Sequence, residues 1–398
     1  MTVSLLDPAV FHEAVPHEEF DRLRREEPVL WTPAEFGTNT DGCWSLTRYA
    51  DIAAVGRDVA TFTNTLGANY PILPSETARM ADNVMFNDPP RQTELRRFLG
   101  AAFTPRMVAR FTDWITTQVD AIIKNLAGRG ECDFVPLVAV ELPAQVICSV
   151  IGVPQEERAR VVAWADTIFG RLRPDIGPEK SVAAIQEVME YALELRESVA
   201  GGTEVNMITE LAKAERDGVK ITDSEYRQMI MSLLIAGFET THTLIGQGMR
   251  LILENADIEA QARAAAERGD TRQLVEEFLR FVTPAMLMVR HATRDVELHD
   301  KVIKKDESVL LWFAAANRDP AVFENPHTFD ASRTPNPHQT FGGGGPHFCI
   351  GNHLARLELQ ILFRDLLTRG PRITLNGRPE RGWSIQINQL RSLPVACE

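Results

Sequence analysis

The sequence predicts a mainly α-helical protein with a smaller β-rich portion, folded as a single large domain over residues 1–398. Apolar residues recur every three or four positions over long stretches, which is typical of amphipathic helices. The clearest such stretches are residues 107–125, 138–151, 156–172, 180–199 and 222–255. Short runs of β-forming residues lie near residues 28–48, 285–312 and 372–396. No serine/glycine linker, repeat or low-complexity run divides the chain, so we expect one domain.

Composition excludes several classes of protein. The net charge of −13 and the pI near 5.3 argue against nucleic-acid binding, because phosphate contacts require a basic surface. The five cysteines are widely spaced and odd in number, which is typical of a reducing, cytoplasmic environment. The N-terminus has no basic region before its short apolar patch, so we expect no signal peptide. The longest apolar run, residues 229–238, is far shorter than the roughly 20 residues that a membrane span needs. We expect a cytoplasmic monomer without a membrane anchor.

The first 74 residues predict an opening helix, a hairpin and then a loop. Residues 17–25 have the pattern of a short amphipathic helix, and residues 29–31 and 42–47 read as two strands around a polar turn. Residues 63–74 contain asparagine, glycine and proline positions that break both periodicities. Because loops held by a scaffold often carry function, we expect this loop to cover a pocket.

The longest predicted helix contains an unusual centre. Thr222 and Glu225 have the side chains of a capping box, and helical periodicity then continues to residue 255. At 1.5 Å per residue this helix would be roughly 50 Å long. Gly237 lies in its interior, where glycine costs about 1 kcal/mol relative to alanine. Three threonines follow within four residues, so the weakened centre indicates a functional requirement.

Four consecutive glycines followed by a lone cysteine form the most informative stretch of the chain. Residues 342–345 are glycine and Cys349 follows shortly before a helical pattern, so Cys349 lies near a helix N-terminus, a position that favours the thiolate. A single cysteine on a glycine-rich loop indicates a metal centre that needs one protein ligand, and haem iron is the leading candidate. The simpler alternative is a buried cysteine that acts as a small apolar side chain.

This stretch resembles the haem-binding loop of the cytochrome P450 family. Gly345, His347, Cys349 and Gly351 fall in the family's register, whereas Phe341 lies one residue further from the cysteine than is usual. Two further motifs occur in the family's order, the stretch from residue 236 to 241 and the Glu277/Arg280 pair. The resemblance implies a cytochrome P450 fold and a soluble bacterial haem-thiolate monooxygenase.

The resemblance also implies roles for individual residues. Cys349 would be the axial ligand of the haem iron, and Ala236 and Gly237 would leave room above it. Glu239 and Thr240 would deliver protons through ordered water to the oxygen that is being reduced. The remaining cofactor-binding residues would be Gln92, Arg96, Arg290, His347 and Gly351. Gln92 stands where the family usually has histidine, so propionate binding should be somewhat weaker. The structural residues would be Glu277, Arg280 and Arg333, two guanidinium groups around one carboxylate.

A substrate pocket lined by apolar side chains is expected above the haem. Its candidate residues are Ile72, Leu73, Phe169, Leu233, Ala285, Met286, Leu287, Met288 and Ile387. Such residues are more often simply part of a hydrophobic core.

The predicted activity is the insertion of one atom of O2 into a C–H bond of a largely apolar small molecule, with haem b (iron protoporphyrin IX) as cofactor. No flavin- or nicotinamide-binding glycine motif is present, so electrons from NAD(P)H would arrive through a ferredoxin reductase and a ferredoxin. Arg96, Arg97, Arg106 and Arg356 would form the basic patch on which the ferredoxin docks.

Three alternatives remain. The substrate could be an amino acid or acyl group tethered to a carrier protein, which only a comparison of free and tethered acids distinguishes. The chain could instead be a non-catalytic haem sensor or electron carrier, which sustained substrate-dependent oxygen consumption would exclude. A peroxide-using member of the family would tend to lack the acid–threonine pair, which is intact here at Glu239 and Thr240.

Overall fold

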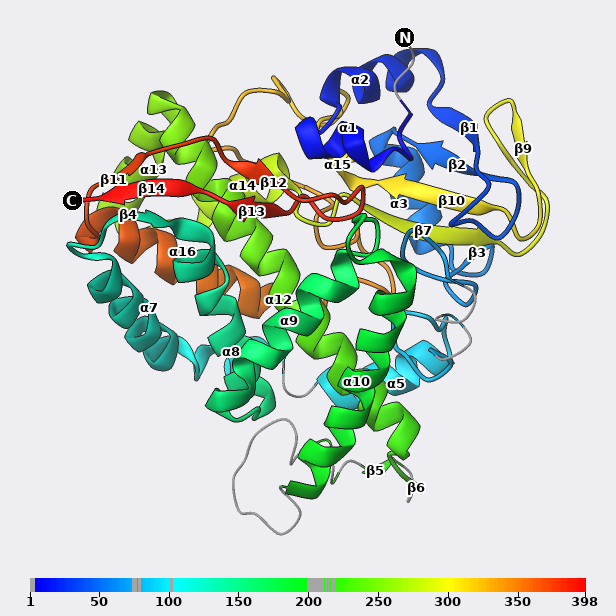
Figure 1. Ribbon diagram of the computed structural model, residues 1–398. Helices are drawn as coiled ribbons and strands as arrows, with labels where there is room; N and C mark the ends of the chain where they lie inside the picture. Colours follow the sequence, from blue (N-terminus) through cyan, green and yellow to red (C-terminus); the bar gives the residue numbers. More distant parts are fainter. Residues whose placement is uncertain are drawn as a thin grey trace.

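Helix α12 (Asp223–Glu254) runs through the helical part of the computed structural model, with α9 (Arg158–Phe169) and α10 (Gly177–Ser198) crossing in front of it (Figure 1). Its N-terminus has the expected capping box: the Thr222 hydroxyl accepts from the Glu225 N–H at 3.2 Å, and the Glu225 carboxylate accepts from the Thr222 N–H at 2.7 Å. The helix is long and apolar enough to cross a membrane, but 78% of its most apolar window is buried inside the protein. α12 is therefore a core helix.

The structure describes residues 4–73, 77, 80–100, 103–198, 211, 213, 215–216 and 219–398. The ends of two expected elements, Pro74 and Val199, lie outside these residues. The other described helices are α1 (Pro8–Glu13), α2 (His17–Glu26), α3 (Tyr49–Arg57), α5 (Arg91–Gly100), α6 (Pro105–Ala109), α7 (Thr112–Leu126), α8 (Glu141–Ile151), α9 (Arg158–Phe169), α10 (Gly177–Ser198), α13 (Ala256–Glu267), α14 (Arg272–Val282), α15 (Phe313–Ala316) and α16 (Asn352–Arg369), with a π-helical turn η1 (Val135–Ala139) and a 3-10 turn η2 (Gln155–Glu157).

Strands occupy the three regions that the sequence predicts and several short segments besides. They are β1 (Val29–Pro33), β2 (Gly42–Leu46), β3 (Phe62–Thr63), β4 (Gly130–Asp133), β5 (Glu215–Arg216), β6 (Val219–Lys220), β7 (Leu287–Ala292), β8 (Val296–Leu298), β9 (Lys301–Ile303), β10 (Ser308–Trp312), β11 (Ile373–Leu375), β12 (Glu380–Arg381), β13 (Leu390–Ser392) and β14 (Pro394–Cys397).

The largest sheet among the described residues has the strand order β1-β2-β10-β7-β3. β10 pairs parallel with β2 and antiparallel with β7, so it joins the N-terminal hairpin to the C-terminal half of the chain. This sheet lies to one side of the helical body (Figure 1). A smaller sheet, in the order β11-β14-β4, pairs the C-terminal strand with a segment near residue 130.

The predicted helix over residues 107–125 is interrupted in the structure. α6 ends at Ala109 and α7 begins at Thr112. Thr104 caps α6 by accepting from the Met107 N–H at 3.4 Å, and Pro105 occupies its first turn, where a missing N–H costs nothing. These local signals start a separate short helix, which periodicity alone does not reveal.

A buried charge network ties α14 to the segment that leads into the cysteine loop. Arg280 donates two hydrogen bonds to the Glu277 carboxylate, at 2.7 and 2.8 Å, and Arg333 Nε lies 3.2 Å from Glu277 Oε2. Arg280 also donates to the backbone oxygens of Asn317 and Pro326. The two guanidinium groups therefore surround one carboxylate, as the resemblance implies.

Candidate functional site

The cysteine loop turns back on itself through glycines in the left-handed region. Gly342, Gly343, Gly344 and Gly345 have φ values of 97°, 67°, 98° and 80°. These values favour glycine, since other residues have a Cβ that clashes there. The Cys349 N–H donates to the Phe341 carbonyl at 2.9 Å, which closes the loop. The additional glycine is thus taken up in the turn, and Cys349 still lies just before α16.

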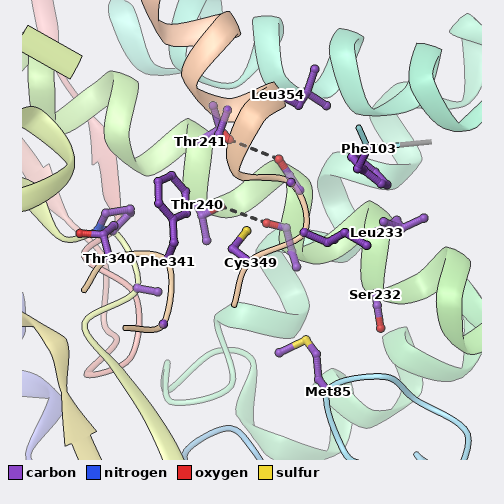
Figure 2. Close-up of a pocket in the computed structure, with 18 of the residues that line it drawn as sticks. Met85, Phe103, Ser232, Leu233, Thr240, Thr241, Thr340, Phe341, Cys349 and Leu354 are labelled. Carbon is purple, nitrogen blue, oxygen red and sulfur yellow. Dashed lines mark hydrogen bonds between the residues drawn. The ribbon is translucent and has the colours of Figure 1, made fainter. Parts of the chain in front are cut away.

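Cys349 lines a cavity of about 260 Å³ whose wall is mostly apolar. Ala236, Gly237 and Thr240 of α12 line the same cavity, and Figure 2 shows Cys349 and Thr240 among its side chains. The structure therefore brings the predicted ligand and the predicted centre of the long helix into one site.

The protonation of the Cys349 thiol differs from the expectation. Burial raises the pKa of this thiol, and the Gly351 N–H and the charges of Arg96 and Arg356 offset that increase only in part. The N–H groups at the helix N-terminus therefore favour the thiolate but do not by themselves outweigh the burial. A metal cation bound to the sulfur would, because metal coordination deprotonates a thiol outright.

The backbone of α12 at the cavity is bonded by its own threonines. The Thr240 hydroxyl donates to the Ala236 carbonyl at 3.0 Å and the Thr241 hydroxyl to the Gly237 carbonyl at 3.4 Å (Figure 2). Packing between helices provides a structural reason for glycine at position 237, because a Cβ there would lie 2.7 Å from Cδ1 of Ile147 on α8. Glycine at this position therefore allows α8 and α12 to pack closely.

Glu239 does not line the cavity but is buried behind it. Its Oε1 has no hydrogen-bond partner among the described residues, and its Oε2 lies 3.6 Å from His242 Nδ1. Both ring nitrogens of His242 are buried and also lack partners in the described part of the chain. His242 was not predicted from the sequence, although its position three residues after Glu239 places the two side chains on one helix face. Buried polar atoms of this kind usually bind ordered water.

Gln92, Arg96, Arg290 and His347 line one part of the cavity. Gln92 donates to the Pro346 carbonyl at 2.7 Å and Arg96 donates to the Phe348 carbonyl at 2.5 Å. Two residues of α5 therefore hold the backbone on either side of His347, and both also line the cavity.

The chemistry of these donors suits carboxylate ligands. Arg290 Nε and His347 Nε2 are buried without a hydrogen-bond partner among the described residues. Burial lowers the pKa of Arg290 to about 10 and also lowers the pKa of His347. Asp88 is the nearby carboxylate, 3.6 Å from His347 Nε2. Carboxylates of a bound cofactor would satisfy these donors, so the residues present fit the propionates of haem.

Six residues that we expected in the pocket wall lie elsewhere. Leu233, Ala285 and Met288 line the cavity, whereas the others do not. These six are Ile72, Leu73, Phe169, Met286, Leu287 and Ile387. The alternation of side chains along β7 explains the position of Leu287: because Met288 faces the cavity, Leu287 faces the opposite side of the strand. There Leu287 packs in a second hydrophobic cluster with Met286 and Ile72. Ile387 pairs through an isolated bridge with Ala285, Phe169 packs against the main core, and Leu73 is buried outside the cavity wall.

Glu358 was not among the site residues predicted from the sequence. This residue of α16 lines the cavity, is buried, and has no partner for its Oε1 within the described part of the chain. Burial raises its pKa to about 8. A signal was present, since Glu358 follows Leu354 by one turn and precedes Ile361 and Leu362 on the apolar face of that helix.

The four arginines of the predicted basic patch lie in different environments. Arg97 and Arg106 are exposed, but Arg96 lines the cavity. Arg356 donates two hydrogen bonds to Glu276, at 2.6 and 2.9 Å, so its charge is neutralised by a residue 80 positions earlier in the chain.

Comparison with known proteins agrees with this geometry. The family model described as Cytochrome P450 matches residues 178–369. A steroid C26-monooxygenase of Mycolicibacterium smegmatis is 34% identical, over 95% of this chain and 90% of that protein. A methyl-branched lipid omega-hydroxylase of Mycobacterium tuberculosis is 31% identical, over 94% of this chain and 90% of that protein. Among solved structures, a cytochrome P450 of Mycobacterium marinum in complex with pseudoionone has a TM-score of 0.91 and 32% identity, covering 99% of this chain and 98% of that one.

Proposed function

This chain belongs to the cytochrome P450 family and is a monooxygenase, and from that premise we propose that it hydroxylates a terminal carbon of a largely apolar small molecule. The names of two relatives specify a steroid and a methyl-branched lipid as substrates, and each name specifies one position of oxidation. The mostly apolar cavity wall supports a substrate of the same kind. The single observation that carries the proposal is that Cys349 and the centre of α12 share this cavity.

The residues of the site would hold haem b by both its iron and its carboxylates. Cys349 would bind the iron through sulfur, while Arg96, Arg290 and His347, together with Gln92, would donate hydrogen bonds to the propionates. When bound, haem supplies the binding of O2 and its activation by two electrons.

The chain itself supplies protons and excludes water. The Thr240 hydroxyl lines the cavity, and Glu239 lies one residue earlier but behind the wall. Protons taken up by Glu239 would therefore reach the cavity through ordered water and the hydroxyl of Thr240. Ala236 carries only a methyl group at the wall, which leaves space for O2 and the substrate carbon. The apolar wall keeps bulk water away from the reacting centre.

We place the protein in the cytoplasm, where a ferredoxin reductase would take electrons from NAD(P)H and a ferredoxin would deliver them to this chain. α6 packs against α16, the helix that follows Cys349, and it carries Arg106. We therefore place the docking site at the exposed Arg97 and Arg106, on a monomer of otherwise acidic charge. Reversing both charges should slow ferredoxin-driven reduction at low salt, while reduction by dithionite stays unchanged; equal rates in the variant and the parent protein would contradict this docking site.

The function is tested with the purified holoprotein, ferredoxin, reductase and NADPH. We expect oxygen consumption that depends on an apolar substrate, and a product that carries a hydroxyl group on a terminal carbon. Panels of free steroids, branched lipids and fatty acids should be compared with acyl groups tethered to a carrier protein. Oxidation of the tethered acids alone would identify a carrier-dependent hydroxylase, and the absence of any substrate-dependent oxygen consumption would contradict the proposal and favour a haem sensor or electron carrier.

A further inference from the structure

Ser232 places a hydroxyl group in an otherwise apolar part of the cavity wall. It lies on α12 two turns before Thr240, with Ala236 between them, and all three residues line the cavity. Spacing of four residues keeps them on one face of the helix. The neighbouring wall residues Met85 and Leu233 are apolar, and Figure 2 shows both near Ser232 at the end of the cavity away from Thr241.

Among the described residues, the hydrogen bonds around Ser232 leave its hydroxyl proton without an acceptor. The Asn83 side-chain oxygen accepts from the Met85 N–H at 2.9 Å. A backbone N–H can only donate, so this contact fixes the orientation of the Asn83 amide and turns its NH2 group toward Ser232. Asn83 Nδ2 then donates to Ser232 Oγ at 2.7 Å. Ser232 is thereby an acceptor in this pair, and among the residues that the structure describes no atom accepts its own hydroxyl proton.

We propose that the Ser232 hydroxyl donates a hydrogen bond to an oxygen atom of the substrate, so that the preferred substrate is an apolar chain that carries a carbonyl group. The inference rests on the proposed function and adds the position of a polar group to it. Eight residues separate Ser232 from Thr240, which is about 12 Å along the helix. With the oxidised carbon beside Thr240, the carbonyl oxygen should lie about 12 Å from that carbon.

The same hydrogen bond provides selectivity. A pure hydrocarbon would bury the Ser232 hydroxyl without any acceptor, and a site built around a polar contact discriminates against ligands that lack it. Asn83 strengthens this effect, because by donating to Ser232 it polarises the hydroxyl that donates onward.

The test compares straight-chain alkan-2-ones, from octan-2-one to tetradecan-2-one, with the alkanes of equal length. Binding to the holoprotein is measured by the spin-state change of the haem absorption, and products are identified in the same samples. We expect the best ketone to bind about fivefold more tightly than its alkane, the worth of one neutral hydrogen bond. This advantage should vanish in Ser232→Ala and in Ser232→Cys, which nearly preserves the volume. In Leu233→Ala, the matched control, ketone and alkane should weaken together.

The possible outcomes distinguish a failure of the assigned hydrogen bond from a failure of the proposed function. If no ketone in the panel has an advantage over its alkane, or if the advantage survives in both Ser232 variants, the assigned hydrogen bond is wrong. Terminal hydroxylation that continues in that case would leave the proposed function standing. If ketone-selective binding is found without any hydroxylated product, the anchor is correct and the proposed function fails.

Discussion

Glu358 provides a test of the buried electrostatics of the site. This carboxyl group is buried on α16, and burial raises its pKa from 4.5 to about 8. The folded chain therefore keeps its proton up to about pH 8, whereas the unfolded chain loses it near pH 4.5. The stability associated with this group is complete below pH 4.5 and is lost as the pH rises toward 8. Glu358→Gln removes the titration, because glutamine carries no charge in either state.

The magnitude follows from the two pKa values. Each unit of pKa difference corresponds to about 1.4 kcal/mol, and the whole range from pH 5 to pH 7 lies between the two pKa values. The free energy of unfolding of the parent protein, relative to that of Glu358→Gln, should therefore fall by about 2.5 kcal/mol from pH 5 to pH 7. The stability of Glu358→Gln therefore rises relative to that of the parent protein over this pH range.

Urea unfolding of the two holoproteins at pH 5 and pH 7 measures this change. Asp365→Asn is the matched control on the same helix. Burial alone would raise the pKa of Asp365, but hydrogen bonds from Arg364 and Arg369 outweigh it and hold the pKa below its usual range. Asp365 is therefore ionised in both states above pH 5, and the difference between its variant and the parent protein should stay constant. A constant difference for Glu358→Gln as well would refute the reasoning.

Three further predictions concern the network, the long helix and the proton path. Glu277→Gln should lower the free energy of unfolding by at least about 3 kcal/mol, because it leaves buried guanidinium groups without a carboxylate. The control Glu259→Gln, at an exposed ion pair, should change the free energy of unfolding by less than about 0.5 kcal/mol in the same urea assay. Equal losses in the two variants would contradict the structural role of Glu277. Gly237→Ala should lower the free energy of unfolding by about 1–3 kcal/mol, because the added Cβ contacts Ile147. Adding Ile147→Val, which lacks Cδ1, should restore most of that loss. If the second substitution has no effect, the contact is not the cause of the loss. Thr240→Ala should keep consuming NADPH while much of the oxygen is released as hydrogen peroxide, as measured by a peroxide assay beside product yield, and fully coupled product formation would remove the role assigned to this hydroxyl.

Local signals predicted the framework of the site well. The capping box at Thr222 and Glu225 is a contact within one helix turn, so it could be identified from spacing alone. The Glu277 and Arg280 pair is also local, and the resemblance supplied Arg333 as the third member. Cys349 could be singled out because an expensive run of glycines precedes it.

Contacts between distant segments were the part that sequence reasoning could not predict. Arg356 looked like a free surface charge because nothing near it in the sequence reveals Glu276 as its partner. The face that a strand presents to a cavity also depends on its neighbours, so the sequence could not show that Met288 lines the cavity and Leu287 does not. The hydrogen bond between Asn83 and Ser232 joins residues 149 positions apart and has no local signal at all.

The central claim, that the sulfur of Cys349 binds the haem iron, is tested most directly by the absorption spectrum of the reduced protein with carbon monoxide. We predict the long-wavelength Soret band that a thiolate ligand produces, and its loss in Cys349→Ser. A parent protein that takes up haem but lacks this band, or a Cys349→Ser variant that keeps it, would contradict the account.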